Sequence, residues 1–168
     1  MVAEVTHPAT QMRRNATAQR EFKAFDGERH VLESDDQLDQ YFEGEWKGNK
    51  RLSGLAIFPS LDGWSRSAIV RQGDPQRSAW TTDAKIWGEM LDKVGLEGSV
   101  LYPTAALALG LMQSHDFQTA VATAYNNWLE AEYTQKDERL HGVGVMSIND
   151  MGAARKELVR CATQRKNF

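Results

Sequence analysis

The sequence has one cysteine, no long apolar run and no excess of positive charge. Cys161 has no partner for an intramolecular disulfide, which favours a reducing compartment, and we expect a cytoplasmic protein. No stretch approaches the ~20 apolar residues of a membrane span, and residues 1–20 lack the apolar core of a secretory signal. The net charge of -3 argues against binding to nucleic acid or to an anionic membrane through bulk charge.

Several catalytic motifs are also missing. The sequence has no glycine-rich phosphate loop, and Gly142-Val-Gly144 is only a G-x-G inside an expected strand. It has no G-x-S-x-G nucleophile elbow. Cys161 falls on the apolar stripe of an expected helix, where packing is a more frequent role than nucleophilic catalysis. These absences argue against a nucleotide-binding loop and against a serine or cysteine hydrolase.

The length of 168 residues suits one domain, and 41% hydrophobic and 26% charged residues are typical of a globular chain. A (β/α)₈ barrel usually has about 250 residues, and its smallest examples have about 200. Residues 1–20 are polar and aperiodic, so we expect a flexible arm ahead of a domain over residues 21–168. Frequent glycine and proline over residues 43–83 predict an irregular insertion that packs through its tryptophans.

The other residues predict alternating strands and helices. A first strand lies within residues 21–33, where Asp26-Gly27 predicts a break or a bulge. Apolar spacing and end signals then predict a short helix over 37–42, a helix over 83–94 stopped by Gly95, a strand over 99–102, a buried helix or turn over 105–112, a helix from Ser114 to Leu129, a strand over 142–148, and a last helix capped by Asn149 or Asp150. This order predicts an α/β fold with a parallel sheet and right-handed crossovers.

Glu28-Arg29-His30 is the strongest candidate for chemistry. Residues i and i+2 of a strand point to the same face, so a carboxylate and an imidazole at this spacing can reach one metal ion. Oxygen and nitrogen ligands suit a divalent metal such as zinc or manganese. The alternative is a solvated glutamate and histidine at a strand end, because E-x-H also recurs by chance.

The other histidines do not complete a metal site. His7 lies in the expected arm. His141 precedes the expected strand over 142–148, so we expect it at the amino-terminal rim, whereas active sites form at the carboxyl ends of parallel strands. His115 lies in the first turn of a helix, where a surface role is the more frequent one. A catalytic zinc needs about three protein ligands, and Glu28 and His30 supply two.

Several segments together resemble the amidohydrolase-related family, the metal-dependent (β/α)₈ barrels that include aminocarboxymuconate-semialdehyde decarboxylase. The segment DGERHVLE over 26–33 is similar to the family's first strand, in which an H-x-H, D-x-H or E-x-H pair of ligands is followed by an apolar pair and a glutamate. VLYPT over 100–104 is similar to a family strand end, AYNNWL over 124–129 to a family helix, and RLHGV over 139–143, with Asn149-Asp150 after it, to a family strand and helix start.

The resemblance implies a partial (β/α)₈ TIM-barrel-like structure of about three βα units with a long irregular insertion. By matching the motif it makes Glu28 and His30 metal ligands and places Pro103 and Thr104 near the barrel mouth. Full-length members hydrolyse or decarboxylate small organic substrates with a divalent metal, for which zinc is the first expectation here. Their later ligands, a histidine and an aspartate, have no counterpart in this sequence.

We therefore expect a truncated or split member of this family that binds metal weakly or not at all as an isolated chain. A partial barrel exposes strand edges and half a core, so it is expected to need self-association or a partner chain. Two alternatives stay open, a half-barrel that completes its site across subunits and a non-catalytic interaction module. The missing ligands leave open whether the chain is an enzyme.

Overall fold

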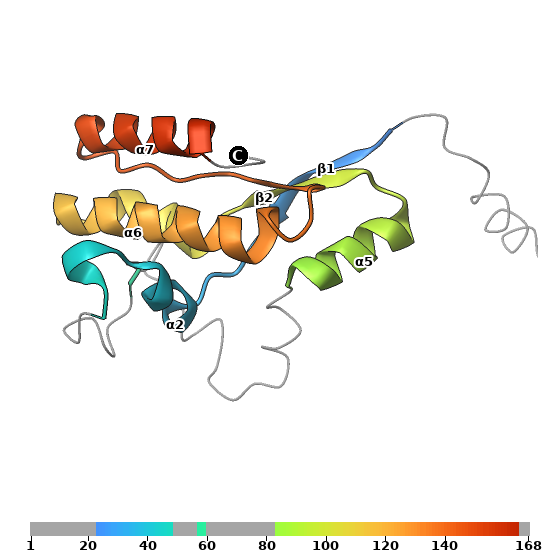
Figure 1. The fold of residues 1–168 in the computed structure, drawn as a ribbon, viewed down its shortest axis with the longest axis horizontal. Coiled ribbons are helices and arrows are strands. Elements are labelled where there is room, and N and C mark those ends of the chain that lie inside the picture. The colour runs from blue at the N-terminus through green and yellow to red at the C-terminus, as the bar shows by residue number, and fades with distance from the viewer. Residues whose placement is uncertain (1–22, 49–56, 60–82, 165–168) are drawn as a thin grey trace, which may run out of the picture.

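A computed structural model describes residues 23–48, 57–59 and 83–164 (Figure 1). The expected arm over residues 1–20 and most of the expected insertion over 43–83 lie outside these described residues. Within them, helices pack against a parallel sheet, which confirms the predicted α/β class.

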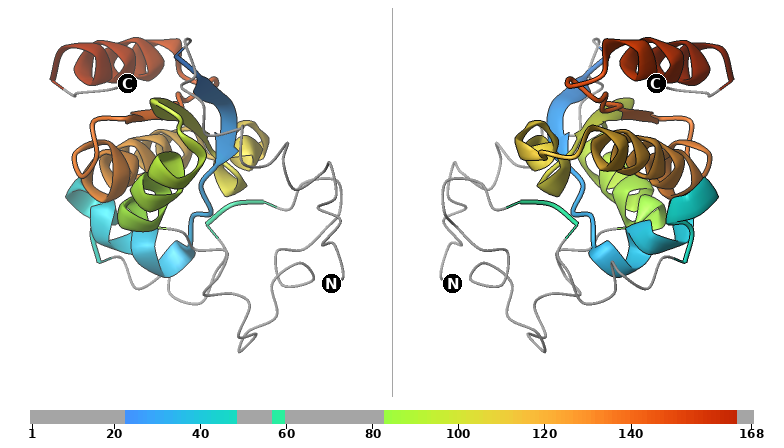
Figure 2. Two further views of the ribbon diagram at one scale, coloured as in Figure 1. Left: turned by 90° about the vertical axis from the view of Figure 1, so that its right-hand side faces the viewer. Right: turned by 90° about the vertical axis from the view of Figure 1, so that its left-hand side faces the viewer.

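The sheet holds three parallel strands in the order β1-β2-β3. β1 spans Phe25–His30, β2 spans Gly98–Tyr102, and β3 spans Leu140–Gly142. Helix α5 (Ala84–Val94) precedes β2, and helix α6 (His115–Leu129) lies between β2 and β3 in the chain. Parallel neighbours require such crossover connections. Figure 2 shows α5 and α6 on the same side of β1.

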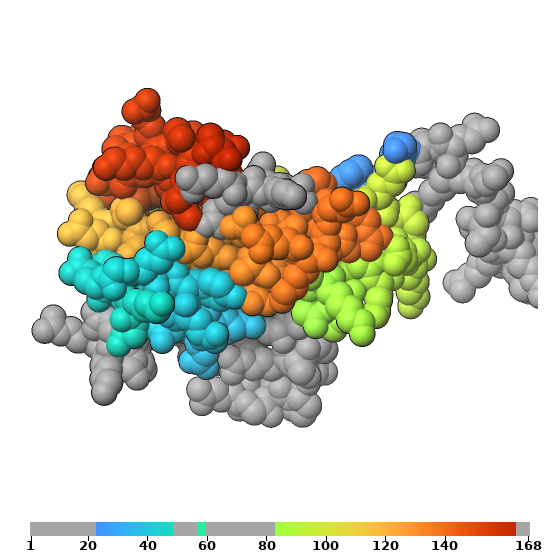
Figure 3. All heavy atoms as spheres, in the orientation of Figure 1, coloured from blue at the N-terminus to red at the C-terminus, as the bar shows by residue number. Residues whose placement is uncertain are grey.

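The other helical segments are short except for the last one. They are α2 (Asp35–Leu38), the 3₁₀ turns η1 (Asp39–Tyr41), η2 (Gly44–Trp46) and η3 (Ala105–Leu111), the π-helical turn η4 (Glu130–Thr134), and α7 (Met151–Gln164). Figure 3 shows α7, α6 and the segment around α2 side by side across one face of the molecule. No helix among the described residues is long and apolar enough to span a bilayer.

Helix ends follow local capping signals. The side chains of Asp83 and Ser114 cap the amino ends of α5 and α6 by accepting backbone hydrogen bonds. Gly95 ends α5 with a φ of 71°, a left-handed conformation that glycine adopts without steric cost. Before α7, Asp150 Oδ1 accepts a hydrogen bond of 2.9 Å from the N–H of Ala153, so Asp150 is the cap of the last helix.

The predicted strand over 142–148 has the wrong bounds, because β3 covers Leu140–Gly142 and therefore includes His141. The residues after β3 follow no regular ladder. Asn126 on α6 donates a hydrogen bond of 3.0 Å to the carbonyl of Val145 and accepts one of 2.9 Å from its N–H. The backbone of Val145 therefore bonds to an amide side chain and not to a neighbouring strand. The apolar run in the sequence does not reveal this difference.

The segment over 105–112, predicted to be apolar and buried on all sides, is the 3₁₀ turn η3 with one exposed face. Leu107 is 56% exposed and Leu111 is 52% exposed, whereas Ala106 and Leu109 are buried. The apolar composition of this segment therefore overstates its burial.

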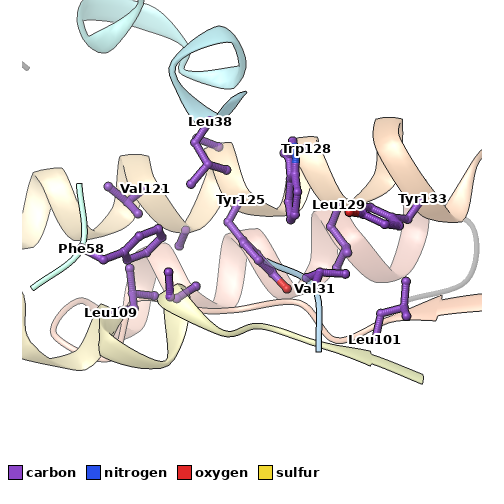
Figure 4. Close-up of a cluster of buried hydrophobic side chains, with 14 of the residues drawn as sticks. Val31, Leu38, Phe58, Leu101, Leu109, Val121, Tyr125, Trp128, Leu129 and Tyr133 are labelled. Atoms are coloured by element: carbon purple, nitrogen blue, oxygen red, sulfur yellow. The ribbon is translucent and has the colours of Figure 1, made fainter. Parts of the chain in front are cut away.

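The hydrophobic core lies between the sheet and α6 (Figure 4). Tyr125, Trp128 and Leu129 of α6 are buried in one cluster with Val31, which follows β1, and Leu101 of β2. The ring centres of Tyr125 and Trp128 are 5.8 Å apart, a typical aromatic packing distance. These contacts place the aromatic side chains of α6 in the core and confirm the helix predicted from Ser114 to Leu129.

Candidate metal centre

The two faces of the sheet differ in what covers them. Ser99 and Leu101 of β2 are fully buried beneath the helices. Arg29 of β1 pairs with Leu101, and its guanidinium lies 5.4 Å from the ring centre of Trp87 on α5. Because side chains alternate along a strand, the neighbours of these residues point away from the helices. We call this second surface the open face, and it is formed by Phe25, Glu28, His30, Val100, Tyr102 and His141.

A bulge in β1 decides which residues reach the open face. Three steps along β1, from Asp26 to Arg29, match two steps along β2, so β1 holds one extra residue. Phe25 and His30 would lie on opposite faces of a regular strand because their spacing is odd. The extra residue places both on the open face, and the bulge predicted at Asp26-Gly27 is confirmed.

His30 lies at the carboxyl end of β1, where its imidazole is held by the next strand. Its Nδ1 is 2.7 Å from the carbonyl oxygen of Pro103. A carbonyl can only accept, so Nδ1 carries a proton, and in the neutral imidazole the lone pair is then on Nε2. The ring also packs against Tyr102, with the ring centres 6.0 Å apart. Metal-binding histidines commonly have this arrangement, in which one ring nitrogen donates to a carbonyl and the other faces the metal.

Glu28 is exposed, on the same side of β1 as His30. Its backbone N–H donates a hydrogen bond of 3.2 Å to Asp26 Oδ1 within the bulge, and the Asp26 carboxylate also bonds to Arg29. Burial acts to raise the pKa of the Asp26 carboxyl, but the hydrogen bonds from Arg29 and from the N–H of Glu28, together with the charge of Arg29, outweigh burial and lower this pKa. The charge of Arg29 is therefore directed to Asp26, and within the described residues the carboxylate of Glu28 makes no hydrogen bond or ion pair.

Glu28 and His30 do not by themselves make a metal site. Among the described residues, no group of three or more histidine, cysteine, aspartate or glutamate side chains could hold a metal ion. A catalytic zinc needs about three protein ligands. The imidazole of His30 and the exposed carboxylate of Glu28 are ligand types that zinc takes, and a complete site would need at least one ligand beyond this pair.

The two other described histidines lie elsewhere. His115 is exposed in the first turn of α6. His141 was expected just before its strand, but it is the middle residue of β3 and pairs with Val100. Its ring packs against Phe25 with the ring centres 5.8 Å apart. Neither histidine joins His30 in a cluster.

Sequence reasoning missed the part that Glu33 has in this region. Its side chain is 1% exposed and accepts backbone hydrogen bonds from Thr104 at 3.1 Å, from Ala105 at 2.8 Å and from Ala106 at 3.2 Å. Glu33 follows β1, and the three donors follow β2 and begin η3. The carboxylate therefore ties together the loops at the carboxyl ends of two strands, next to the contact between His30 and Pro103.

Burial raises the pKa of Glu33, and the hydrogen bonds from the three backbone N–H groups offset part of that effect. Burial also raises the pKa of Tyr125 well above its ordinary value, and the nearby charge of Glu33 adds to this. Glu33 is the last residue of the family-like motif that starts at Asp26. This motif is the one feature of the sequence that indicated Glu33. Its three backbone partners are distant in the chain, so only the fold reveals them.

Comparisons with known proteins point to one fold. No protein-family model and no curated protein matches the sequence. Among solved structures, the chain is similar to an amidohydrolase from Mycobacterium avium subsp. paratuberculosis K-10, with a TM-score of 0.53 and 15% sequence identity. The described fold is amidohydrolase-like. The match covers 83% of this chain and 46% of the other, so this chain spans about half the length of that amidohydrolase.

The predicted resemblance to amidohydrolases is thus confirmed for the fold. Three parallel strands with their helices agree with part of such a structure, and the described strands do not form a closed barrel. At 15% identity the likeness concerns the arrangement of the backbone alone. The decarboxylase-like branch of the family stays a prediction.

Proposed function

We propose that this chain is a truncated or split relative of the metal-dependent amidohydrolases, with Glu28 and His30 as metal ligands. The observation that carries this proposal is the 2.7 Å contact between His30 Nδ1 and the carbonyl oxygen of Pro103. It fixes the tautomer that leaves Nε2 for a metal, at the carboxyl end of a parallel strand, where active sites form in α/β folds. The amidohydrolase-like fold supports the same assignment.

Zinc is the metal that suits this pair best, and manganese is the second choice. A bound divalent ion lowers the pKa of a coordinated water and polarises a substrate carbonyl or carboxylate. Pro103 orients the imidazole of His30, and the bulge in β1 keeps that imidazole on the open face beside Glu28. The substrate class is a small organic compound that the whole fold hydrolyses or decarboxylates. With two ligands from one chain, metal binding by the isolated chain is weak.

The test is a titration of the full chain with zinc chloride, followed by ¹H–¹⁵N spectra of the imidazole rings. These spectra detect weak binding and report each ring nitrogen separately. We expect the Nε2 resonance of His30 to shift while Nδ1 stays protonated. We expect Glu28→Gln to weaken the apparent affinity about tenfold or more, in the range reported for changes around metal ligands.

The matched control is His115→Ala, because His115 is exposed on α6 and belongs to no proposed site. This variant should leave the zinc response of His30 unchanged. A His30 resonance that stays fixed throughout the titration would overturn the proposal, as would an unchanged zinc affinity in Glu28→Gln.

A second candidate function is a non-catalytic interaction module. The exposed aromatic side chains of Phe25 and Tyr102 on the open face favour it, because a parallel sheet is normally covered on both faces. In that case the His30 resonance does not respond to zinc, while mutation of Phe25 still weakens binding to a partner chain. The single cysteine, Cys161, supports a place in the cytoplasm for either function.

A further inference from the structure

The open face carries exposed side chains of a kind that proteins usually cover. Phe25 is 54% exposed and Tyr102 is 36% exposed. Val100 and His141 lie half-buried between them, and Val100 pairs with His141 across β2 and β3. All-parallel sheets occur almost only with both faces covered. A stretch of aromatic and aliphatic surface on such a sheet therefore indicates an interface.

The edges of the sheet point to the same conclusion. β2 lies in the middle, so β1 and β3 are the edge strands of the described sheet. Each edge exposes backbone groups that can pair with a further strand. Both edge strands run parallel to β2. A partner that pairs with both edges and keeps all strands parallel must place one strand beside β3 and another beside β1.

We propose that the open face and the two edges bind a second copy of this chain around a two-fold axis that runs along the strands. In this arrangement β3 of each copy lies beside β1 of the other, and all strands remain parallel. Both edges of both copies are then paired, as in a closed cyclic dimer. The two open faces meet in the interior and cover Phe25 and Tyr102.

The charge of the open face favours a second copy as the occupant. Glu28 is the one carboxylate among the six residues of the open face, which limits the repulsion between two identical faces. An aromatic and histidine-rich surface with little charge resembles the buried centre of an interface.

The dimer has a consequence for the metal site, and this part of the inference rests on the proposed function. Glu28 and His30 of each copy point into the shared interior, so two incomplete ligand pairs line one space. A second copy thereby offers the further ligands that zinc requires. The dimer itself rests only on the sheet, its edges and the exposed side chains.

The experiment compares the mass in solution of the full chain with the masses of two aspartate variants, by sedimentation equilibrium. Phe25→Asp places a charge on the open face. The matched control is Ile86→Asp, because Ile86 is 50% exposed on α5, which packs on the opposite face of the sheet. We expect the unmodified chain and Ile86→Asp to be dimers, and Phe25→Asp to dissociate with at least a tenfold higher dissociation constant.

Tyr102→Asp repeats the test at the carboxyl end of the sheet, and circular dichroism shows whether each variant is folded. A monomeric unmodified chain would overturn the proposal. So would an open series of larger assemblies, or a dimer that responds equally to Phe25→Asp and Ile86→Asp. If the chain is a dimer but the His30 resonance does not respond to zinc, the dimer proposal stands and the proposed function is wrong. If the chain is a monomer and His30 binds zinc, the proposed function stands and the dimer proposal is wrong.

Discussion

Glu33 and Ala105 are 72 residues apart in the chain, yet a hydrogen bond of 2.8 Å joins the buried carboxylate of Glu33 to the backbone N–H of Ala105. This contact fastens the loop after β1 to the turn after β2. His30 and Pro103 make their contact between the same two loops. A buried structural carboxylate thus sets the geometry around the candidate metal ligand.

The first prediction concerns Glu33→Gln. Both carboxylate oxygens of Glu33 accept backbone hydrogen bonds. The amide of glutamine has one oxygen that can accept, and its NH₂ group would face backbone N–H groups that are themselves donors. We expect the free energy of unfolding at neutral pH to fall by about 1–3 kcal/mol, as when a buried polar group loses its partner. Urea denaturation measures this change.

Glu28→Gln is the control for that experiment, because Glu28 is exposed. Its effect on the free energy of unfolding should stay within about 0.5 kcal/mol. Equal stability of Glu33→Gln and the unmodified chain would show that the buried carboxylate does not hold the two loops together.

The second prediction concerns Gln118, which is fully buried on α6. Its Nε2 donates to the carbonyl of Leu109 at 2.9 Å, and its Oε1 accepts from Ser147 Oγ at 2.6 Å and from the N–H of Asn149 at 3.1 Å. Gln118→Ala removes all three hydrogen bonds, leaves their partner groups unbonded and creates a cavity. We expect a loss of about 2–4 kcal/mol in the free energy of unfolding.

Gln113→Ala is the matched control for Gln118→Ala. Gln113 is exposed, and its side chain makes one local bond of 3.4 Å to the carbonyl of Leu111. Its removal should change the stability by no more than about 0.5 kcal/mol. Similar losses for the two glutamines would contradict a specific role of Gln118 in joining η3, α6 and the segment before α7.

The third prediction concerns acid and Glu157, which joins α7 to α6. Its carboxylate accepts hydrogen bonds from Asn126 at 2.7 Å and from Arg160 Nε at 2.7 Å. Burial acts to raise the pKa of Glu157, but these bonds outweigh burial and hold the pKa below its ordinary value of 4.5. The folded protein therefore binds this proton less readily than the unfolded chain does.

A carboxyl whose pKa is lowered by folding contributes stability above its unfolded pKa, and this contribution is lost as the pH falls through the folded pKa. We expect the free energy of unfolding to decrease on acidification from about pH 5 downward, and to decrease less steeply in Glu157→Gln. Urea denaturation at a series of pH values measures both slopes. Glu89→Gln on the exposed side of α5 should keep the slope of the unmodified chain, and an equally steep slope in Glu157→Gln would refute the assignment.

Much of the local structure could be predicted because its causes are close together in the chain. Asp83 and Gly95 mark the ends of α5 through a side-chain cap and a left-handed glycine. The stripe that includes Tyr125 and Trp128 identifies α6 through helical spacing alone. These signals depend on a few neighbouring residues, so they hold whatever the rest of the chain does.

The wrong predictions concern contacts between residues that are far apart in the sequence. The apolar run after Gly142 predicts a long strand, but the backbone of Val145 bonds to the side chain of Asn126. Leu107 and Leu111 are apolar yet exposed, because η3 buries one face only. In both cases the composition is compatible with two structures, and distant partners decide between them.

By itself the sequence determined the order of strands and helices, their caps, the bulge near Asp26, and Glu28 and His30 as a pair of candidate ligands. Tertiary structure alone decided that Pro103 sets the tautomer of His30, that Glu33 is a buried tie between two loops, and that Phe25 shares a face with His30. The physical reason is distance along the chain. Propensity and capping act over a few residues, whereas these contacts join segments about 70 residues apart and form only when the parallel strands align.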